Sequence, residues 1–168
     1  MPKDAKIVIN TGPLLALVAA CGDLTLLQKM YREVIVPPQV CKEIMKGGST
    51  NFAVAQFKEA FWLKKWTDEL AIEPFLNNTL DLGEASVVQL AIQENIKTVC
   101  IDETIGRRVA RLHGLQLTGS IGILLRAKNE EHIASVLDAV NNMRSHGIWL
   151  SERVVSFALR KSGERAPE

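Results

Sequence analysis

Residues 6–15 have the sequence Lys6-Ile7-Val8-Ile9-Asn10-Thr11-Gly12-Pro13-Leu14-Leu15, in which apolar residues typical of a buried strand lead through a polar turn into an apolar helix. The same pattern returns at Thr98-Val99-Cys100-Ile101-Asp102-Glu103, before an amphipathic run at 104–113. In open α/β sheets, ligands bind in the crevice at the carboxyl ends of the strands. We therefore expect Asn10 and Asp102 to share one edge of a sheet as candidate site residues. The alternative is that each side chain only caps the following helix.

Length and composition favour one globular domain over residues 1–168. The chain has 168 residues, of which 47% are hydrophobic and 23% charged, enough for a substantial core. A formal net charge of +1 means that any nucleic-acid contact must come from local basic patches. The three cysteines, Cys21, Cys41 and Cys100, lack metal-type spacing and are expected to be buried thiols in a reducing compartment. The apolar run at 14–20 is too short to span a bilayer and no signal-peptide pattern precedes it, so we expect a cytoplasmic protein without a membrane segment.

Short segments rich in Val and Ile alternate with helical periodicity along the chain. We expect strands at 6–10, 34–36, 98–101 and 115–118, and helices at 13–20, 24–31, from Pro38 to Gly47-Gly48-Ser49, 82–95, 103–113, 120–128, 130–145 and 151–161. The middle is less regular, with a helix at 52–61, a short strand or helix end at 62–66, and a helix or irregular segment at 67–78. Because parallel strands need crossover connections, this order predicts an α/β fold: a three-layer α/β/α sandwich around a mostly parallel sheet. The helices of a carboxy-terminal extension at about 129–163 then cover a flank or a subunit interface.

Two glutamates add to the acidic candidates. Glu43 lies in Val40-Cys41-Lys42-Glu43-Ile44, and Glu84 lies in Leu80-Asp81-Leu82-Gly83-Glu84-Ala85. Hard cations such as Mg²⁺ and Mn²⁺ take oxygen ligands, so carboxylates that converge with Asp102 would form a site for phosphodiester hydrolysis. The alternatives remain open: Asp81 and Glu84 have the spacing of a capping box, and Glu43 can be a solvated helix residue.

A set of motifs in fixed order resembles the PIN-domain superfamily, most closely its prokaryotic branch related to the toxin ribonucleases of type II toxin–antitoxin pairs. The resemblance covers nearly the whole chain. Its motifs are Ile9-Asn10-Thr11-Gly12-Pro13-Leu14, Val34-Ile35-Val36-Pro37 with Val40 and Glu43-Ile44, Leu82-Gly83-Glu84-Ala85, Ile101-Asp102-Glu103 with Arg107-Arg108-Val109-Ala110, residues 118–128, and the tail at 147–151 and 162–164.

The resemblance implies a three-layer sandwich whose acidic residues bind Mg²⁺ or Mn²⁺ and cleave RNA. By position, Glu43, Glu84 and Asp102 match the acids of the family, and Ser120 lies near a place where a further polar ligand can occur. Asn10 departs from the pattern, because PIN nucleases generally carry Asp there, whereas the branch that this chain resembles often has a neutral residue. Its amide oxygen can still ligate a metal, but it adds no charge and cannot act as a base.

Contacts to RNA phosphates can come from basic side chains near the acids. Arg107 and Arg108 begin one turn beyond Asp102 and are the first candidates, followed by Arg111, Arg126 and Lys128, with Thr11 and Ser120 as polar contacts. Alternatively, these cations form a solvated face, and Arg107 pairs with Glu103 on its own helix. The run Trp62-Leu63-Lys64-Lys65-Trp66 could stack bases, although core packing is the more common role of such residues.

These observations favour a metal-dependent ribonuclease, the toxin-like component of a toxin–antitoxin pair, with RNA and an antitoxin protein as partners. The second hypothesis is a catalytically weakened or inactive PIN module that binds RNA or a protein. A nucleotide-binding α/β domain ranks third, because no G-x-G-x-x-G or P-loop signature follows any strand. We also expect a homodimer, formed through apolar faces of the first helix (Leu14, Leu17 and Val18) or of the last helix (Val154, Phe157 and Ala158). The alternative is that these side chains pack within one chain.

Overall fold

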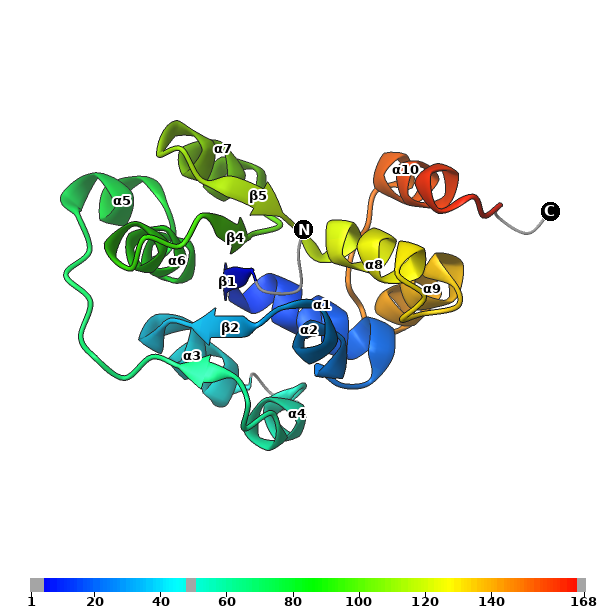
Figure 1. Ribbon diagram of the computed structural model, residues 1–168, viewed down its shortest axis with the longest axis horizontal. Helices are drawn as coiled ribbons and strands as arrows, with labels where there is room; N and C mark the ends of the chain where they lie inside the picture. Colours follow the sequence, from blue (N-terminus) through cyan, green and yellow to red (C-terminus); the bar gives the residue numbers. More distant parts are fainter. Residues whose placement is uncertain (1–4, 48–50, 166–168) are drawn as a thin grey trace.

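A computed structural model describes residues 5–47 and 51–165, and a five-stranded sheet lies at its centre (Figure 1). The strands are β1 (Lys6–Ile9), β2 (Glu33–Val36), β3 (Lys64–Lys65), β4 (Thr98–Cys100) and β5 (Gln116–Thr118), in the spatial order β3-β2-β1-β4-β5. All four neighbouring pairs are parallel, and Ile9 lies beside Cys100. The expected parallel sheet is confirmed, and the carboxyl ends of all its strands lie along one edge.

Helices cover both faces of this sheet. They are α1 (Thr11–Cys21), α2 (Thr25–Met30), α3 (Pro38–Lys46), α4 (Val54–Glu59), α5 (Pro74–Thr79), α6 (Leu82–Gln93), α7 (Thr104–Leu112), α8 (Ser120–Asn129), α9 (Val136–Ser145) and α10 (Glu152–Ser162). Figure 1 shows α3, α5 and α6 on one side of the strands, and α1, α2, α8 and α9 on the other. The three-layer α/β/α sandwich is therefore confirmed. No helix in the described part of the chain is both long and apolar enough to cross a membrane.

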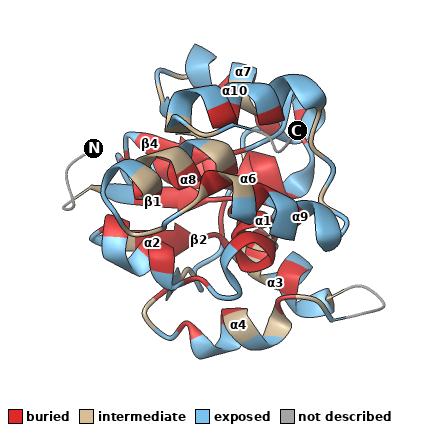
Figure 2. Ribbon diagram, turned by 90° about the vertical axis from the view of Figure 1, so that its right-hand side faces the viewer, coloured by how far each residue is buried: buried red, intermediate tan, exposed pale blue. Residues whose placement is uncertain are grey.

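The core extends from the inner strands into the helices that pack on them, as the burial colours of Figure 2 show. Ile7, Val8 and Ile9 are fully buried, which is typical of a parallel strand covered on both faces. The first helix is buried as well, because α1 packs against α9. Its residues Leu14, Leu17 and Val18 thus belong to the core of one chain, and the expectation that they form a dimer face is wrong. On the last helix, Val154 and Phe157 stay partly exposed, whereas Ala158 is buried.

Several helix boundaries differ from the expected ones because of local backbone geometry. The helix expected at 130–145 begins only at Val136, since Glu131 has a φ of 62° and Ser135 caps the helix by accepting from the Asp138 amide at 3.1 Å. The helix expected at 52–61 begins at Val54, after Ala53 with a φ of 68°. Segment 67–78 is irregular up to Glu73 and helical only from Pro74, a residue favoured at the first helical position.

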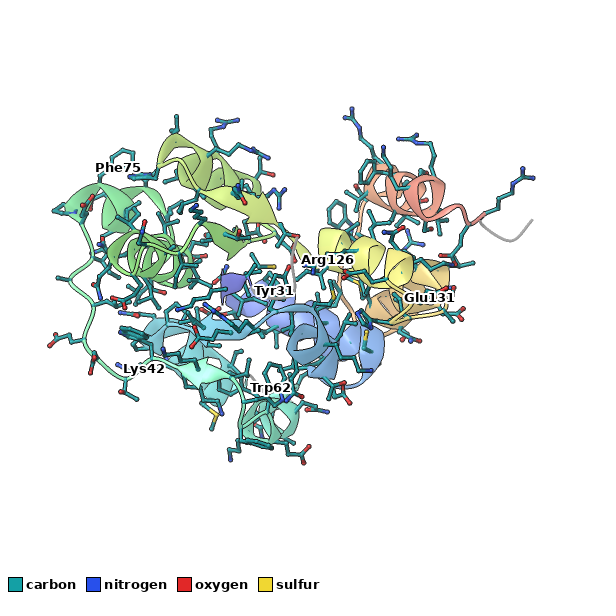
Figure 3. The ribbon with its side chains drawn as sticks, viewed as in Figure 1. Tyr31, Lys42, Trp62, Phe75, Arg126 and Glu131 are labelled. Atoms are coloured by element: carbon teal, nitrogen blue, oxygen red, sulfur yellow. The ribbon has the colours of Figure 1, made fainter. Side chains whose placement is uncertain are left out.

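Two expectations about single residue types also change. Cys21 is exposed, so only Cys100 of the three cysteines is a fully buried thiol. Trp62 and Trp66 are half-buried and pack against the core, which favours the core-packing interpretation of this aromatic pair (Figure 3).

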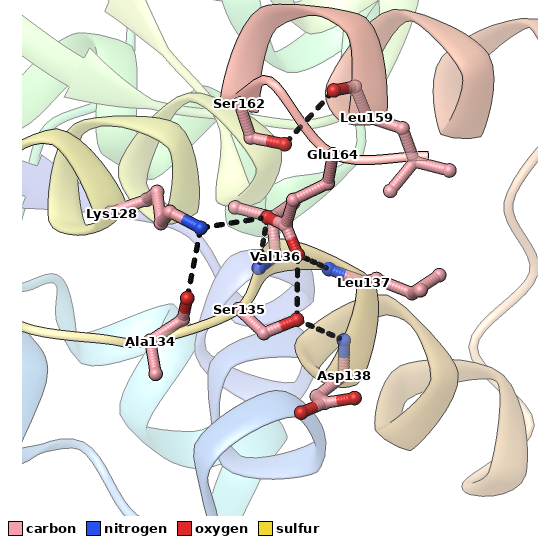
Figure 4. Close-up of polar contacts among 9 residues, drawn as sticks. All are labelled: Lys128, Ala134, Ser135, Val136, Leu137, Asp138, Leu159, Ser162 and Glu164. Atoms are coloured by element: carbon pink, nitrogen blue, oxygen red, sulfur yellow. Dashed lines mark hydrogen bonds and ion pairs between the residues drawn. The ribbon is translucent and has the colours of Figure 1, made fainter. Parts of the chain in front are cut away.

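The Glu164 carboxylate joins the segment that follows α10 to the start of α9. Glu164 accepts hydrogen bonds from Ser135 Oγ at 2.7 Å and from the Val136 amide at 2.7 Å, and it pairs with Lys128 at 3.3 Å (Figure 4). A negative charge at this position also matches the positive end of the α9 dipole. Glu164 therefore ties the segment after α10 to the amino terminus of α9.

Candidate functional site

Asn10 and Asp102 lie at the carboxyl ends of the neighbouring strands β1 and β4. The backbone N–H of Asn10 donates to the Cys100 carbonyl at 3.1 Å, so the backbones at the two strand ends run side by side. Asn10 occupies the N-cap position of α1, but its side chain makes no capping hydrogen bond. Asp102 does not cap α7, whose N-cap is Glu103; it accepts instead from the Ser120 amide at 2.8 Å and the Ser120 hydroxyl at 2.9 Å. Side-chain capping is therefore the wrong interpretation for both residues.

Asn10 and Glu43 converge on one point at the start of α6. A methyl group placed on Gly83 would lie 3.0 Å from Asn10 Oδ1 and 3.0 Å from Glu43 Oε2. Glu43 reaches this point from α3, which packs on α6, and Asn10 reaches it from the end of β1. The solvated-helix interpretation of Glu43 is incomplete, because one oxygen of this exposed residue lies over Gly83, as the Asn10 amide oxygen does.

Glu84 follows Gly83 in α6, and its buried carboxylate lies against Gly106 of α7. Asp81 caps α6 by accepting from the Glu84 amide at 2.8 Å, so one half of the expected capping box exists. The Glu84 side chain is only 6% exposed, and its Oε2 has no hydrogen-bond partner in the described residues. Burial raises the pKa of Glu84 to about 8, and the neighbouring carboxylates of Asp81 and Glu103 act in the same direction. With this pKa the metal-free group holds a proton at neutral pH, and a cation bound at its unpartnered oxygen would displace that proton.

Three glycines leave the space that these oxygens occupy, and we call Gly83, Gly106 and Gly119 the glycine cradle. A methyl group on Gly106 would overlap Glu84 Oε2. At Gly119 it would lie 2.6 Å from Asp102 Oδ1. The sequence motifs contain Gly83 and Gly119 but not Gly106, and nothing in the sequence reveals that each of the three glycines faces a candidate acid.

Arg107 lies in the site region and binds the backbone there, a role that the sequence did not predict. Its Nη1 donates to the carbonyls of Ile101 at 2.8 Å and Thr118 at 3.2 Å, at the ends of β4 and β5. In the described residues no ion pair joins it to Glu103. Arg107 thus joins the ends of β4 and β5 beside Asp102, and its contact with RNA stays a prediction.

The other expected RNA contacts divide into exposed and internal residues. Arg108 and Arg111 are exposed on α7 and can still meet a phosphate. Thr11 is buried, and its Oγ1 has no hydrogen-bond partner among the residues that the structure describes. Ser120 is buried with its hydroxyl on Asp102, so neither residue is presented to an RNA strand as expected.

Arg126 and Lys128 on α8 are also used within the chain. The Arg126 guanidinium lies 5.2 Å from the Tyr31 ring centre and pairs with Glu130 at 2.6 Å (Figure 3). Lys128 donates to the Ala134 carbonyl at 2.8 Å and pairs with Glu164 (Figure 4). Both cations stabilise the α8 region, so the expectation that they bind phosphates is not supported.

The side-chain oxygen atoms of Asn10 and of the three candidate acids are the kind of ligand that a hard divalent cation prefers. Within residues 5–47 and 51–165, no three His, Cys, Asp or Glu side chains are arranged to hold a metal ion. Mg²⁺ commonly needs only one or two carboxylates and completes its coordination with waters and substrate oxygens. Glu43, the Asn10 amide oxygen and the unpartnered Glu84 oxygen therefore fit such an ion, with Asp102 on the adjoining strand end.

A protein-family model described as a PIN domain matches residues 6–164. The chain belongs to the PIN-domain family. PIN domains generally are nucleases that act on nucleic acids with divalent metal ions, and the parallel sheet with acids at its carboxyl edge agrees with that architecture. A comparison with curated proteins found no match.

Proposed function

We propose that this PIN domain is a Mg²⁺- or Mn²⁺-dependent ribonuclease that hydrolyses RNA phosphodiester bonds as the toxin-like component of a toxin–antitoxin pair. One observation carries the proposal: oxygens of Asn10 and Glu43 converge at Gly83, beside the buried and unpartnered Glu84. A contribution to fold stability does not explain this convergence, because Glu84, a buried carboxylate with a raised pKa, lowers stability.

In this proposal Glu43, Glu84, Asp102 and Asn10 hold the cation. The chemistry that Mg²⁺ or Mn²⁺ supplies is polarisation of a phosphoryl oxygen and activation of water. Ser120 fixes the Asp102 carboxylate through two hydrogen bonds. Arg107 sets the separation of the strand ends, and the exposed Arg108 binds a phosphate of the RNA.

The test combines a Mn²⁺ titration by calorimetry with cleavage of a labelled RNA, in the presence and absence of a chelator. Glu84→Gln is expected to lose metal affinity and cleavage, because it removes the charge while keeping the shape. Glu94→Gln is the matched control, since Glu94 is exposed at the opposite end of the same helix. Wild-type protein that neither binds Mn²⁺ nor cleaves RNA would overturn the proposal.

A second function is favoured by one specific residue. Asn10 contributes a neutral amide where PIN nucleases generally carry Asp, and among the described residues no three His, Cys, Asp or Glu side chains are arranged to hold a metal ion. Both facts support a PIN module that binds RNA or a protein partner without cleaving. RNA cleavage distinguishes the two functions. In Mn²⁺ the nuclease cleaves RNA, whereas the binding module binds RNA and leaves it intact.

The expected partners and organisation stay proposals. An antitoxin protein as partner, a homodimer, a single domain over residues 1–168 and a cytoplasmic location are parts of the same hypothesis. Exposed apolar side chains on α5 and α7 (Phe75, Ile105 and Leu112) are compatible with self-association. Light scattering that gives a monomer at high micromolar concentration would remove the homodimer from the proposal.

A further inference from the structure

The outward face of α10 combines cations with an aromatic ring. Arg153, Arg160 and Lys161 are exposed, and Phe157 between them is 41% exposed. The charged groups of Arg160 and Lys161 each lie 5.9 Å from the centre of the Phe157 ring. Figure 3 shows nitrogen-tipped side chains of this helix extending away from α8 and α9. We call Arg153, Phe157, Arg160 and Lys161 the α10 face.

The acids nearest in sequence do not neutralise these cations. Glu152 pairs with Arg144 of α9 at 2.9 Å, and Glu164 is bonded to Ser135 and Lys128. No ion pair or side-chain hydrogen bond engages Arg153, Arg160 or Lys161 in the part of the chain that the structure describes. On a chain with a net charge of only +1, the α10 face is therefore a local positive patch.

The surface around these residues is hollowed on both sides of Arg160. One depression of about 570 Å³ is lined by Arg153, Val154, Ser156, Phe157 and Arg160. A second, of about 540 Å³, shares Ser156 and Arg160 and continues to Gly163 and Arg165. Positions 153, 156, 157 and 160 follow the spacing of one helical face, so the two depressions form a continuous track along α10.

We infer that the α10 face is an auxiliary binding surface for single-stranded RNA, with phosphates on Arg153 and Arg160 and a base on Phe157. Proteins that hold single strands combine a positive track with aromatic rings on which bases stack, and both elements are present here. A partner that offers only negative charge would leave the partly exposed ring unused. The inference rests on the proposed function in one respect, namely that the negatively charged ligand is RNA.

The position of α10 relates this surface to the candidate catalytic site. Helix α8 begins at Ser120, which binds Asp102, and it packs against α10. An α-helix of 10 residues is about 15 Å long, so a strand that contacts both places spans several nucleotides. A short oligonucleotide reaches only one of the two surfaces, and affinity is therefore expected to rise with RNA length.

The experiment measures fluorescence anisotropy of a labelled 15-nucleotide oligouridylate in chelator, where no metal-dependent cleavage occurs. The variant Arg153→Gln/Arg160→Gln/Lys161→Gln is compared with Lys29→Gln/Lys58→Gln/Lys97→Gln, which removes the same charge from exposed positions elsewhere. We expect the first to weaken binding at least tenfold and to reduce the salt slope by about 2, and the control to change affinity less than threefold. A 5-nucleotide oligouridylate is expected to bind wild type more weakly.

The variant Phe157→Ala separates RNA from other polyanions. It is expected to weaken oligouridylate binding about threefold to tenfold and to leave binding of inorganic polyphosphate unchanged, because only a base stacks on the ring. Equal effects of the α10 and control triple variants would overturn the inference, as would a Phe157→Ala variant with unchanged RNA affinity. An α10 triple variant that binds RNA like wild type but loses polyglutamate would assign the surface to an acidic protein.

These results are independent of cleavage. RNA binding through α10 without turnover in Mn²⁺ would reject the proposed nuclease activity and keep the surface. Turnover with unchanged binding by the α10 variant would reject the surface and keep the nuclease.

Discussion

Glu84→Gln tests whether the buried carboxylate at the site destabilises the metal-free protein. The ordinary pKa of Glu is 4.5, and burial raises that of Glu84 to about 8 in the folded state. Below pH 4.5 the folded and unfolded states both hold the proton, so the residue has no electrostatic cost. Between pH 4.5 and 8 only the folded state keeps it, and stability falls as pH rises, by about 1.4 kcal/mol per pH unit at most. Above pH 8 the loss is complete.

The size of the stability change follows from the interval between pH 4.5 and pH 8. We expect wild type to lose about 2 to 4 kcal/mol of unfolding free energy from this group between pH 5 and pH 8. Glu84→Gln does not titrate, so its advantage over wild type is smallest at pH 5 and largest at pH 8. Urea denaturation in chelator at pH 5, 6, 7 and 8 measures the difference, with Glu94→Gln as control.

Adding Mn²⁺ provides the second half of this test. The cation favours the ionised carboxylate, so at pH 8 it should stabilise wild type and leave Glu84→Gln nearly unchanged. Stability profiles of wild type and Glu84→Gln that stay parallel from pH 5 to pH 8 would refute the reasoning, because Glu84 would then titrate like an exposed carboxylate.

Asp102→Ala is expected to lose Mn²⁺ affinity and about 1 to 3 kcal/mol of stability, because Ser120 loses the acceptor of two hydrogen bonds. Glu103→Ala, the control, should bind Mn²⁺ like wild type in calorimetry. Equal Mn²⁺ binding by both variants would show that the metal does not bind at Asp102. Asn10→Asp adds a carboxylate opposite Glu43 with little change in volume, so we expect higher Mn²⁺ affinity and faster RNA cleavage; unchanged affinity would mean that Asn10 does not face the metal. Burial alone would raise the pKa of Glu164, but hydrogen bonds from Ser135 and from the backbone amides of Val136 and Leu137 hold this pKa at about 2. The ionised Glu164 therefore stabilises the fold above pH 4.5, and this stabilisation is lost as the pH falls toward 2. Glu164→Gln should therefore be less stable than wild type at pH 7 and equal to it near pH 2 in thermal unfolding; a gap that persists at pH 2 would contradict the ion-based account.

Local sequence patterns were sufficient for four strands of the sheet and for their ends, whereas β3 lies in the segment 62–66, for which a short strand or a helix end was expected. The apolar run 6–9 followed by Asn10 predicted both β1 and the edge at which the site lies, because hydrophobic patterning and turn residues act over a few positions. The start of α9 was not predictable in this way. Residues 130–135 have ordinary helix-forming chemistry, and only the left-handed Glu131 and the contacts of Ser135 with Glu164 displace the helix to Val136.

The roles of individual side chains depended on distant partners. Arg107 lies one turn after Glu103, and this spacing predicted a helix-surface pair or an RNA contact. The carbonyls that it binds belong to Ile101 and Thr118, whose neighbourhood depends on the pairing of β4 with β5. Likewise, Glu84 was identified as a candidate, but its lack of a partner follows from its packing on Gly106, which only the tertiary structure brings close.

The glycine cradle has a consequence for protein engineering. Gly83 and Gly106 lie within helices, where replacement by Ala ordinarily stabilises a protein by about 0.5–1 kcal/mol. A procedure that optimises helix propensity would therefore choose Ala at both positions. At Gly83 the new methyl group would meet Asn10 Oδ1 and Glu43 Oε2 at 3.0 Å, and at Gly106 it would overlap Glu84. In a library of thermostabilised variants, retention of these two glycines would distinguish selection for activity from selection for folding alone.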